Sequence, residues 1–228
     1  MNTTRQQMLQ RIREAVREGN RANGSSEEIP PRGQIGYQGA GNDLMRTFRT
    51  AFTAAGGQLH VVADAADAVG VALDLVRARS IRRVLLGRGE VLEALPIVEA
   101  LRTVGIEIID ALPACSADKE WFAADLGLSG ADFLIAQTGS VVLASRPEQP
   151  RSLSLLPPIH LVVAEHRQLV PDLFDLFAVL SPGEQDWPAC LSIITGPSKT
   201  GDIELRLVTG VHGPEEIHVI LIAGDASR

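Results

Sequence analysis

From residue 43 onward, the sequence alternates between stretches in which apolar residues recur at helical spacing and short apolar runs typical of strands. We expect a helix over residues 43–55 followed by a strand over residues 58–63. A second helix over residues 64–78 is then followed by a strand over residues 82–86. Asp64, directly after the first strand, is a residue type that caps helices at their amino end. Because helix–strand repeats join parallel strands by crossovers, this order constrains the chain to an α/β fold with a mainly parallel sheet.

The amino-terminal part has a different pattern. Residues 4–18 place apolar side chains on one side of a helix and arginines on the other, which predicts an amphipathic helix. Residues 19–41 are rich in Gly, Ser, Asn and Pro, as in a linker or an extended arm. We therefore expect a helix and arm over residues 1–42 and a single α/β domain over residues 43–228. Packing of this helix on a neighbouring subunit would produce a homo-oligomer.

Composition excludes several classes of protein. The chain has 228 residues, 45% of them hydrophobic, which is enough for one substantial core. Its formal net charge of −7, without a dense stripe of Lys and Arg, argues against a nucleic-acid-binding protein. No apolar run approaches the ~20 residues that span a bilayer, and the first residues are unlike a secretory signal. We expect a cytoplasmic protein with no membrane span.

Cys115 and Cys190 are the two cysteines, and they are far apart in the sequence. A four-thiolate iron–sulfur cluster cannot be built from them alone, so any such centre would come from partner proteins. The histidines likewise lack the close spacing of zinc motifs such as HExxH. We predict no metal site and no cofactor in this chain.

The loop over residues 195–200, TGPSKT, follows the apolar run 191–194 and offers hydroxyls and a cation where a strand ends. Open α/β sheets bind ligands at the carboxyl edge of their strands. Gly196 would let the backbone approach a bound group closely. Three side chains could hold carboxylate or phosphate oxygens: Ser198, Lys199 and Thr200. The alternative is that Lys199 is an exposed turn residue.

Asp202, Glu204 and His212 are the candidate catalytic residues. The two carboxylates share a face if their segment is a strand and diverge if it is a helix. On a shared face one carboxylate could hold the other protonated for acid–base chemistry. Alternatively, Asp202 caps a helix and Glu204 is solvated. His212, in a tight turn between glycines, could orient or protonate a ligand, or only hydrogen-bond a turn carbonyl.

The motif GPSKTGDIE, followed by GVHGP and an apolar strand, resembles the carboxyl-terminal signature of the lactate-utilization protein C family, the LUD domain. A second segment agrees in order and spacing, with ADFLIAQTGSVVL over residues 131–143 and RSLSLLPPIH over residues 151–160. The resemblance covers roughly residues 127–222. Gln137 stands where the family pattern has an acidic residue, and Gly201 where alanine is more frequent.

This resemblance implies a three-layer Rossmann-like fold with helices on both faces of the sheet, similar to the sugar-phosphate isomerase and coenzyme A transferase superfamily. The stretch over residues 131–145 predicts a β-hairpin. In such folds a glycine–hydroxyl turn at a strand end cradles phosphate or carboxylate, so Thr138, Gly139 and Ser140 are ligand-binding candidates. Arg151 is the preferred guanidinium clamp for a carboxylate such as that of lactate, or else a solvated loop residue.

The resemblance also implies a part in oxidising L-lactate to pyruvate beside iron–sulfur partner proteins. Three functions remain open. The chain could be a subunit without a cluster that binds substrate or serves as a scaffold. It could be a stand-alone transferase or isomerase acting on a carboxylate or phosphate, with Asp202 or Glu204 as acid–base and Lys199 and Arg151 as anion clamps. It could also be a regulatory or assembly factor, because the residues themselves fix no reaction.

Overall fold

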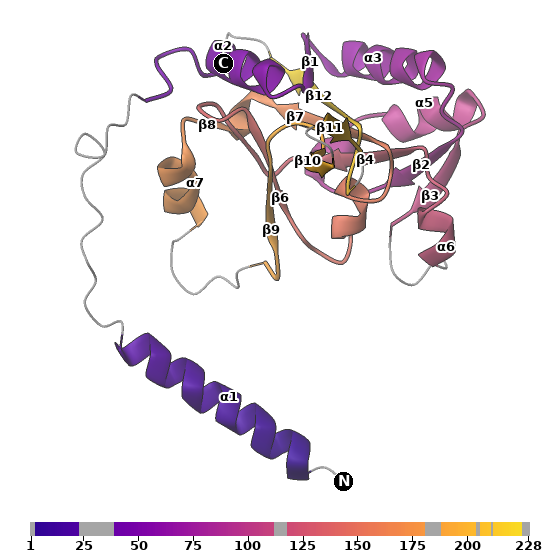
Figure 1. The fold of residues 1–228 in the computed structure, drawn as a ribbon. Coiled ribbons are helices and arrows are strands. Elements are labelled where there is room, and N and C mark those ends of the chain that lie inside the picture. Colours follow the sequence, from indigo (N-terminus) through magenta and orange to yellow (C-terminus); the bar gives the residue numbers. More distant parts are fainter. Residues whose placement is uncertain are drawn as a thin grey trace. The chain divides into compact units, whose positions relative to one another are not determined.

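The fold is organised around a six-stranded sheet in which every neighbouring pair of strands is parallel (Figure 1). The computed structural model describes residues 3–22, 39–111, 118–180, 188–203, 206–210 and 212–224. The strands lie in the order β1 (Gln58–Val62), β12 (Glu216–Ile222), β7 (Ile159–Glu165), β4 (Leu126–Gly130), β2 (Arg83–Leu86) and β3 (Glu107–Asp110). The expected α/β fold with a mainly parallel sheet is confirmed.

The chain divides into two units, Met1–Gln38 and Gly39–Arg228. The first contains the helix α1 (Thr3–Ala22), in agreement with the amphipathic helix expected there. Its apolar residues Met8, Leu9 and Ile12 are all exposed. Most of the expected arm, residues 23–38, lies outside the described residues.

Three helices cover one face of the parallel sheet: α3 (Ala65–Ala78), α4 (Glu90–Glu93) and α5 (Ile97–Thr103). α3 begins where expected because the Asp64 carboxylate accepts hydrogen bonds from the backbone N–H groups of Ala66 and Asp67, at 2.8 and 3.0 Å. The helices contribute residues such as Leu75 to one buried cluster, in which they meet alternate residues of the strands, such as Leu128.

The other face is covered by the helix α2 (Leu44–Ala54) and by a second sheet. This four-stranded sheet has the order β8 (Leu169–Val170), β5 (Phe133–Ile135), β6 (Ser140–Ala144) and β9 (Leu191–Ile194). β5 and β6 are antiparallel and form the expected hairpin. Phe48 and Phe52 of α2 are fully buried, with ring centroids 5.2 Å apart. Helices therefore lie on both faces, but much of the second face packs against strands.

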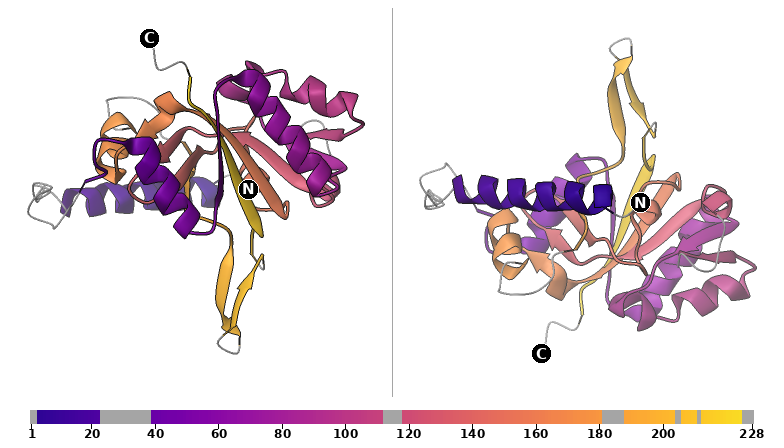
Figure 2. Two further views of the ribbon diagram at one scale, coloured as in Figure 1. Left: turned by 90° about the horizontal axis from the view of Figure 1, so that it is seen from above. Right: turned by 90° about the horizontal axis from the view of Figure 1, so that it is seen from below.

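The remaining elements are short. They are α6 (Asp118–Trp121), η2 (Arg151–Ser154), η3 (His166–Gln168), α7 (Leu173–Leu180), β10 (Lys199–Ile203) and β11 (Arg206–Thr209). β10 and β11 pair in a separate hairpin that extends away from the two larger sheets (Figure 2). The loop over residues 195–200 therefore connects β9 of the smaller sheet to this hairpin.

The strand β4 has the sequence LGLSG, and strand propensity does not predict it. All five of its residues are buried. A Cβ atom at Gly127 would overlap the backbone oxygen of Leu153, because η2 packs directly against this strand. Close packing of η2 therefore requires glycine at this position and takes precedence over the low strand propensity of the segment.

Candidate functional site

The direction of the chain across the parallel sheet reverses between β2 and β4. From β2 the chain passes outward to β3, whereas the strand that follows β4 in this sheet is β7, on the other side. A crevice forms outside the carboxyl ends of the strands at such a point, and ligands of open α/β proteins bind there. A cavity of about 520 Å³ occupies this position, and we call it the switch-point cavity. Its polar lining residues are Arg88, Glu90, Glu93, Asp132, Arg146, Glu148, Gln149, Arg167 and Gln168.

Three arginines of this cavity come from segments that directly follow strands. Arg88, after β2, forms an ion pair of 2.6 Å with Asp110 at the end of β3. Arg146, after β6, forms one of 2.5 Å with Asp132, which follows β4. The parallel sheet brings the ends of β2, β3 and β4 together because the carboxyl ends of its strands share one edge, and β6 of the smaller sheet adds Arg146.

Arg167, after β7, is held by Glu165 and, at 3.1 Å, by Glu90. The hydrogen bond to Glu165 and then the one to Glu90 raise the pKa of Arg167, so it remains a cation. The side chains of Arg88, Arg146 and Arg167 are 43%, 51% and 59% exposed. A small anion can therefore reach each guanidinium without rearrangement of the core.

Two glutamines fix the loops around the cavity. Gln149, which is buried, donates a hydrogen bond from Nε2 to the backbone oxygen of Gly130 at 3.2 Å. Gln168 donates from Nε2 to the backbone oxygen of Ala131. Both acceptors lie at the end of β4, so the loops before η2 and after β7 are tied to the same strand end. The site is thereby preorganised, which lowers the cost of ordering it on binding.

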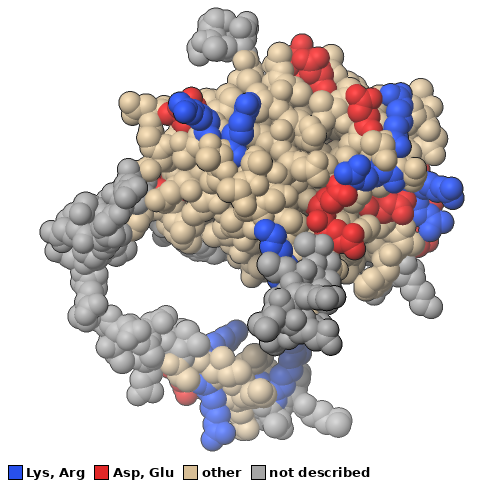
Figure 3. Space-filling view, turned by 45° about the horizontal axis from the view of Figure 1, so that its top comes forward, with Lys and Arg blue, Asp and Glu red and all other residues tan. Residues whose placement is uncertain are grey.

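The charges of the lining nearly cancel, with three arginines against the four carboxylates of Glu90, Glu93, Asp132 and Glu148. Figure 3 shows basic and acidic side chains next to one another at the right of a face that is otherwise mostly uncharged. Such a cavity does not attract a phosphate dianion strongly. Its chemistry matches a monoanion that also carries a hydroxyl group, because guanidiniums can donate hydrogen bonds to a carboxylate and carboxylates can accept one from a hydroxyl group.

A second cavity, of about 580 Å³, adjoins the first and shares Arg88 and Glu93 with it. Its lining combines apolar and charged side chains: Leu86, Leu92, Leu95, Pro96, Val98 and Ile108 with Arg88, Glu93, Glu99, Arg102 and Asp110. The two cavities lie on either side of α4.

The predicted turn over residues 138–140 lies in a different place. Its hydroxyls form a row with the loop after β9: Thr138 Oγ1 and Ser140 Oγ are 2.7 Å apart, and Ser140 Oγ and Thr195 Oγ1 are 2.6 Å apart. Gly139 has φ 62°, and a Cβ atom there would overlap the backbone of Phe52 in α2. The glycine therefore allows the helix to cover the turn closely.

The loop over residues 195–200 is not at the carboxyl edge of the parallel sheet, and that expectation is wrong. β9 belongs to the smaller sheet, and the loop packs where β1 begins, at the amino edge of the parallel sheet. Lys199 Nζ donates a 2.7 Å hydrogen bond to the backbone oxygen of Ala55, the C-cap of α2. A Cβ atom at Gly196 would approach that oxygen to 2.5 Å. Lys199 thus neutralises the negative end of a helix.

The other predicted residues are dispersed. Ser198 makes backbone hydrogen bonds to Pro214 and Gly210, at 2.9 and 3.1 Å. His212 is exposed in the turn between β11 and β12. Arg151 is exposed in η2 and lies beside Ala144, the last residue of β6. Ser140 is at the opposite end of β6, so Arg151 is apart from Lys199.

One member of the predicted carboxylate pair, Asp202, falls in the hairpin. The backbone of Thr200 and Asp202 belongs to β10, which settles the local structure in favour of a strand. Glu204 and the side chains of Thr200 and Asp202 lie outside the described residues, so their acid–base role stays a prediction. Within the described ranges, no group of three or more His, Cys, Asp or Glu side chains is arranged to hold a metal ion.

The model of the LUD domain matches residues 45–222. This range contains the whole parallel sheet, the smaller sheet and the switch-point cavity. The chain belongs to the LUD domain family. Residues 45–222 form most of the unit Gly39–Arg228, so the resemblance carried by the two motifs is confirmed and extends upstream of them.

Curated relatives of this LUD domain align over part of their length. An uncharacterised protein of Neisseria meningitidis is 39% identical over 101 residues, which are 44% of this chain and 43% of that protein. The lactate utilization protein C of Halalkalibacterium halodurans is 41% identical over 95 residues, 40% of this chain and 41% of that protein. The lactate utilization protein C of Geobacillus kaustophilus is 36% identical over 102 residues, which are 43% of this chain and 42% of that protein. The chain thus spans less than half the length of these relatives.

A solved structure shares the fold. The crystal structure of a DUF162 family protein from Deinococcus radiodurans superposes with a TM-score of 0.56 and 22% sequence identity, covering 79% of this chain and 96% of that one. The three-layer Rossmann-like architecture of this LUD domain therefore recurs in a protein of low sequence identity. In the part of the chain that the structure describes, no helix is long and apolar enough to cross a bilayer.

Sequence reasoning missed most of the switch-point cavity. Arg88 lies in Gly87-Arg88-Gly89, which lacks the third glycine of the dinucleotide-binding motif GxGxxG and is therefore a weak signal. Asp132 and Arg167 are separated from it by tens of residues and belong to no shared motif. The signal that could have found them is positional, because each is a charged residue within two positions of the carboxyl end of a parallel strand.

Proposed function

We propose that this LUD domain acts in lactate utilization and binds L-lactate or pyruvate in the switch-point cavity. The names of the Halalkalibacterium and Geobacillus relatives support the pathway. The position of the cavity at the carboxyl ends of β2 and β4 supports the site.

The observation that carries the proposal is the set of three arginines whose guanidiniums are paired with carboxylates and still about half exposed. Exposed ion pairs of this kind contribute only about 0–1 kcal/mol each, so a ligand carboxylate can replace an internal partner at little cost. The carboxylate that is released can then accept a hydrogen bond from the 2-hydroxyl group. Lactate, with one carboxylate and one hydroxyl, matches this arrangement better than a phosphate dianion does.

Oxidation of L-lactate to pyruvate releases two electrons and two protons, and the electrons need an acceptor. With Cys115 and Cys190 alone, this chain does not supply the four thiolates of an iron–sulfur cluster. Our proposal therefore assigns the electron acceptor to iron–sulfur partner proteins and substrate binding or scaffolding to this chain.

Titration calorimetry with L-lactate and pyruvate tests the site. We expect Arg146→Gln and Arg167→Gln to weaken binding roughly 10- to 100-fold, the equivalent of about 1.5–3 kcal/mol for a charge-assisted contact. Arg151→Gln and Lys199→Gln are matched controls, because both remove an exposed cation outside this cavity.

The two pairs of variants decide between two locations. Unchanged affinity in the Arg146 and Arg167 variants, with a loss in the Lys199 and Arg151 variants, would move the site to the loops that the sequence favours. No binding by the wild-type chain, with binding regained on addition of cluster-bearing partners, would indicate a scaffold whose site is completed by those partners.

The second cavity favours one alternative function. About 580 Å³ of additional space beside the switch-point cavity is more than lactate requires. Its mixed apolar and charged lining suits a longer carboxylate or phosphate ligand of a stand-alone transferase or isomerase. Thermal unfolding with coenzyme A and sugar phosphates distinguishes this case. A rise in melting temperature that disappears in Arg88→Gln, while L-lactate gives none, would replace the lactate proposal.

A further inference from the structure

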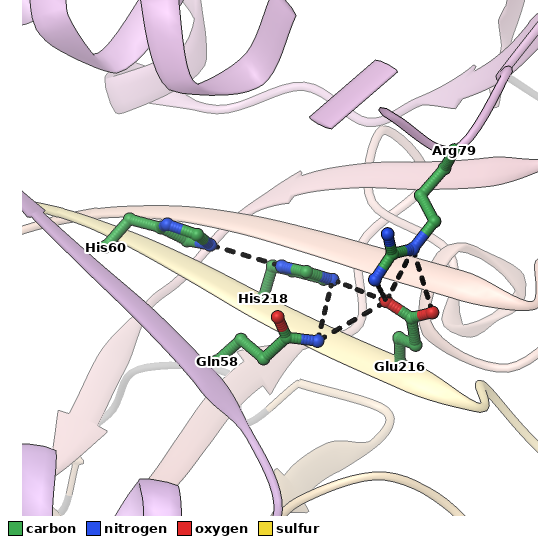
Figure 4. A network of polar contacts seen from close by, with 5 residues as sticks. All are labelled: Gln58, His60, Arg79, Glu216 and His218. Atoms are coloured by element: carbon green, nitrogen blue, oxygen red, sulfur yellow. Dashed lines mark hydrogen bonds and ion pairs between the residues drawn. The ribbon is translucent and has the colours of Figure 1, made fainter. Parts of the chain in front are cut away.

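The amino edge of the parallel sheet carries a row of polar side chains on the face covered by α3. His60 lies on β1, His218 and Glu216 lie on β12, and Arg79 is the C-cap of α3. We call these four residues the histidine row; Gln58 lies beside them (Figure 4). The row is not part of the switch-point cavity, so its protonation does not depend on the lactate site proposed there.

The two imidazole rings meet end to end. His60 Nε2 and His218 Nδ1 are 3.2 Å apart, the ring planes differ by 9° and the ring centroids are 5.5 Å apart. Figure 4 shows the facing nitrogens directed at each other. This geometry is that of an N–H···N hydrogen bond, in which one nitrogen carries the proton and the other accepts it.

The far side of His218 is held by a carboxylate. His218 Nε2 lies 3.0 Å from Glu216 Oε2, which fixes Nε2–H as the donor and leaves Nδ1 as the acceptor from His60. Arg79 binds both oxygens of Glu216, with Nε at 3.0 and 3.1 Å and a terminal nitrogen at 3.0 Å. The row therefore connects β1, β12 and the end of α3 through consecutive polar contacts.

The proton count of the row is limited. With both histidines neutral, the His60–His218 contact and the His218–Glu216 contact each have one donor and one acceptor. Gln58 Nε2 lies 3.4 Å from both His218 Nε2 and Glu216 Oε2, and it donates to the carboxylate. One additional proton can be accommodated, because a charged His218 donates to Glu216 and to a neutral His60. A second additional proton would place two N–H groups face to face at 3.2 Å, so the contact between the strands would have to open.

The surroundings disfavour the charged forms. The side chain of His218 is 2% exposed, and burial lowers its pKa although the hydrogen bond to Glu216 opposes this. Burial and then the neighbouring His218 lower the pKa of His60. From β7, the register neighbours of Glu216 and His218 are the apolar Ile159 and Leu161. Arg79 is the cation that faces the row from α3, and Gln58, from β1, is neutral.

We propose that the histidine row is a pH-sensitive latch that holds the edge strand β1 and the end of α3 onto β12. β1 pairs with β12 alone in the parallel sheet, whereas β7 has a strand on both sides. Both histidines bind protons less readily when folded than when unfolded, so the latch is fully effective above their ordinary pKa and weakens as the pH falls below it. Weakening is confined to the edge of the sheet.

Hydrogen exchange of backbone amides tests this proposal at pH 7.5 and 5.5, with rates corrected for intrinsic exchange. At the lower pH we expect the protection of β1 to fall about threefold or more relative to that of β7. A shift of one full pKa unit would produce about a tenfold change. The double variant His60→Gln/His218→Gln should remove this difference. His166→Gln, an exposed histidine on η3, should retain it.

Two outcomes would overturn the latch: equal loss of protection in β1 and β7 of the wild type, or a difference that persists in the double variant. If the double variant does not fold, NMR titration of the imidazoles in the wild-type protein decides. The latch requires the titrations of His60 and His218 to be coupled, with the second proton binding less readily than the first, and to lie below their ordinary range. Independent titration near the ordinary value contradicts it.

Discussion

The two edges of the parallel sheet use the same pair of chemical groups in opposite ways. At the carboxyl edge, Arg146 and Asp132 face an open cavity, and the guanidinium is half exposed. At the amino edge, Arg79 and Glu216 anchor a histidine that is 2% exposed. Around that edge, Gly196 and Gly139 bring loops into contact with α2. The two ion pairs are themselves similarly exposed. A buried histidine beside one pair and an open cavity beside the other therefore distinguish a pair that locks strands together from one that can exchange partners.

The difference between the edges also affects how glycine-containing loops are interpreted. The motifs that stand out in the sequence, around residues 138–140 and 195–200, lie where backbone segments pack closely. The open cavity is lined by charged residues without a shared motif. In this fold, a glycine-rich loop marks close packing as readily as it marks a ligand.

The largest expected effect concerns the closed packing at Gly139. Gly139→Ala combines φ 62° with an overlap against the backbone of α2, so we expect the free energy of unfolding to fall by about 3 kcal/mol or more. Gly224→Ala is the matched control, because Gly224 has φ 67° and no atom within 4 Å of its Cβ position; it should cost about 1 kcal/mol. Urea denaturation measures both. Equal costs would mean that α2 does not close this region.

A smaller effect is expected from His160, near the amino end of β7. It is fully buried, Nε2 lies 2.9 Å from Ser129 Oγ, and Nδ1 has no hydrogen-bond partner within the described structure. Burial lowers the pKa of His160 to about 4. The unfolded chain therefore binds this proton at a higher pH than the folded chain does, and stability is lost as the pH falls from the ordinary histidine pKa towards 4.

Between pH 8 and pH 5 this group should cost about 2 kcal/mol of the free energy of unfolding. His160→Gln should reduce the pH dependence measured by urea denaturation by that amount. His166→Gln, which changes an exposed histidine, should leave it unchanged. An unaltered pH dependence in His160→Gln would show that the side chain titrates normally and that this part of the sheet is open to water.

The smallest effect separates a structural lysine from a ligand-binding one. Lys199→Gln should lower the free energy of unfolding by about 0.3–1 kcal/mol, because it removes a cation from the carboxyl end of α2. Arg49→Gln, which changes an exposed cation on the same helix, provides the comparison. A loss of L-lactate affinity without a loss of stability would return Lys199 to the binding site.

The alternation of helices and strands was sufficient to predict the parallel sheet, the position of Asp64 as a cap and the hairpin of β5 and β6. It did not predict β4, because Gly127 and Ser129 are there to admit η2 and His160 rather than to favour a strand. It misplaced the loop around Lys199, because an apolar run indicates a strand without indicating which sheet the strand joins. The cavity depends on strand order, which connects Arg88 with Asp132 and Arg167 and which local pattern does not encode.

During synthesis of the chain, β1 emerges long before its neighbour in the sheet, β12. β1 ends at Val62, and its ladder partner β12 ends at Ile222, so 160 residues separate the two. At roughly 5–20 residues per second, the ribosome needs about 8–32 s to deliver that partner. During this interval β1, α2 and the imidazole of His60 are without the strand that covers them, and a chaperone has its longest opportunity to bind this segment.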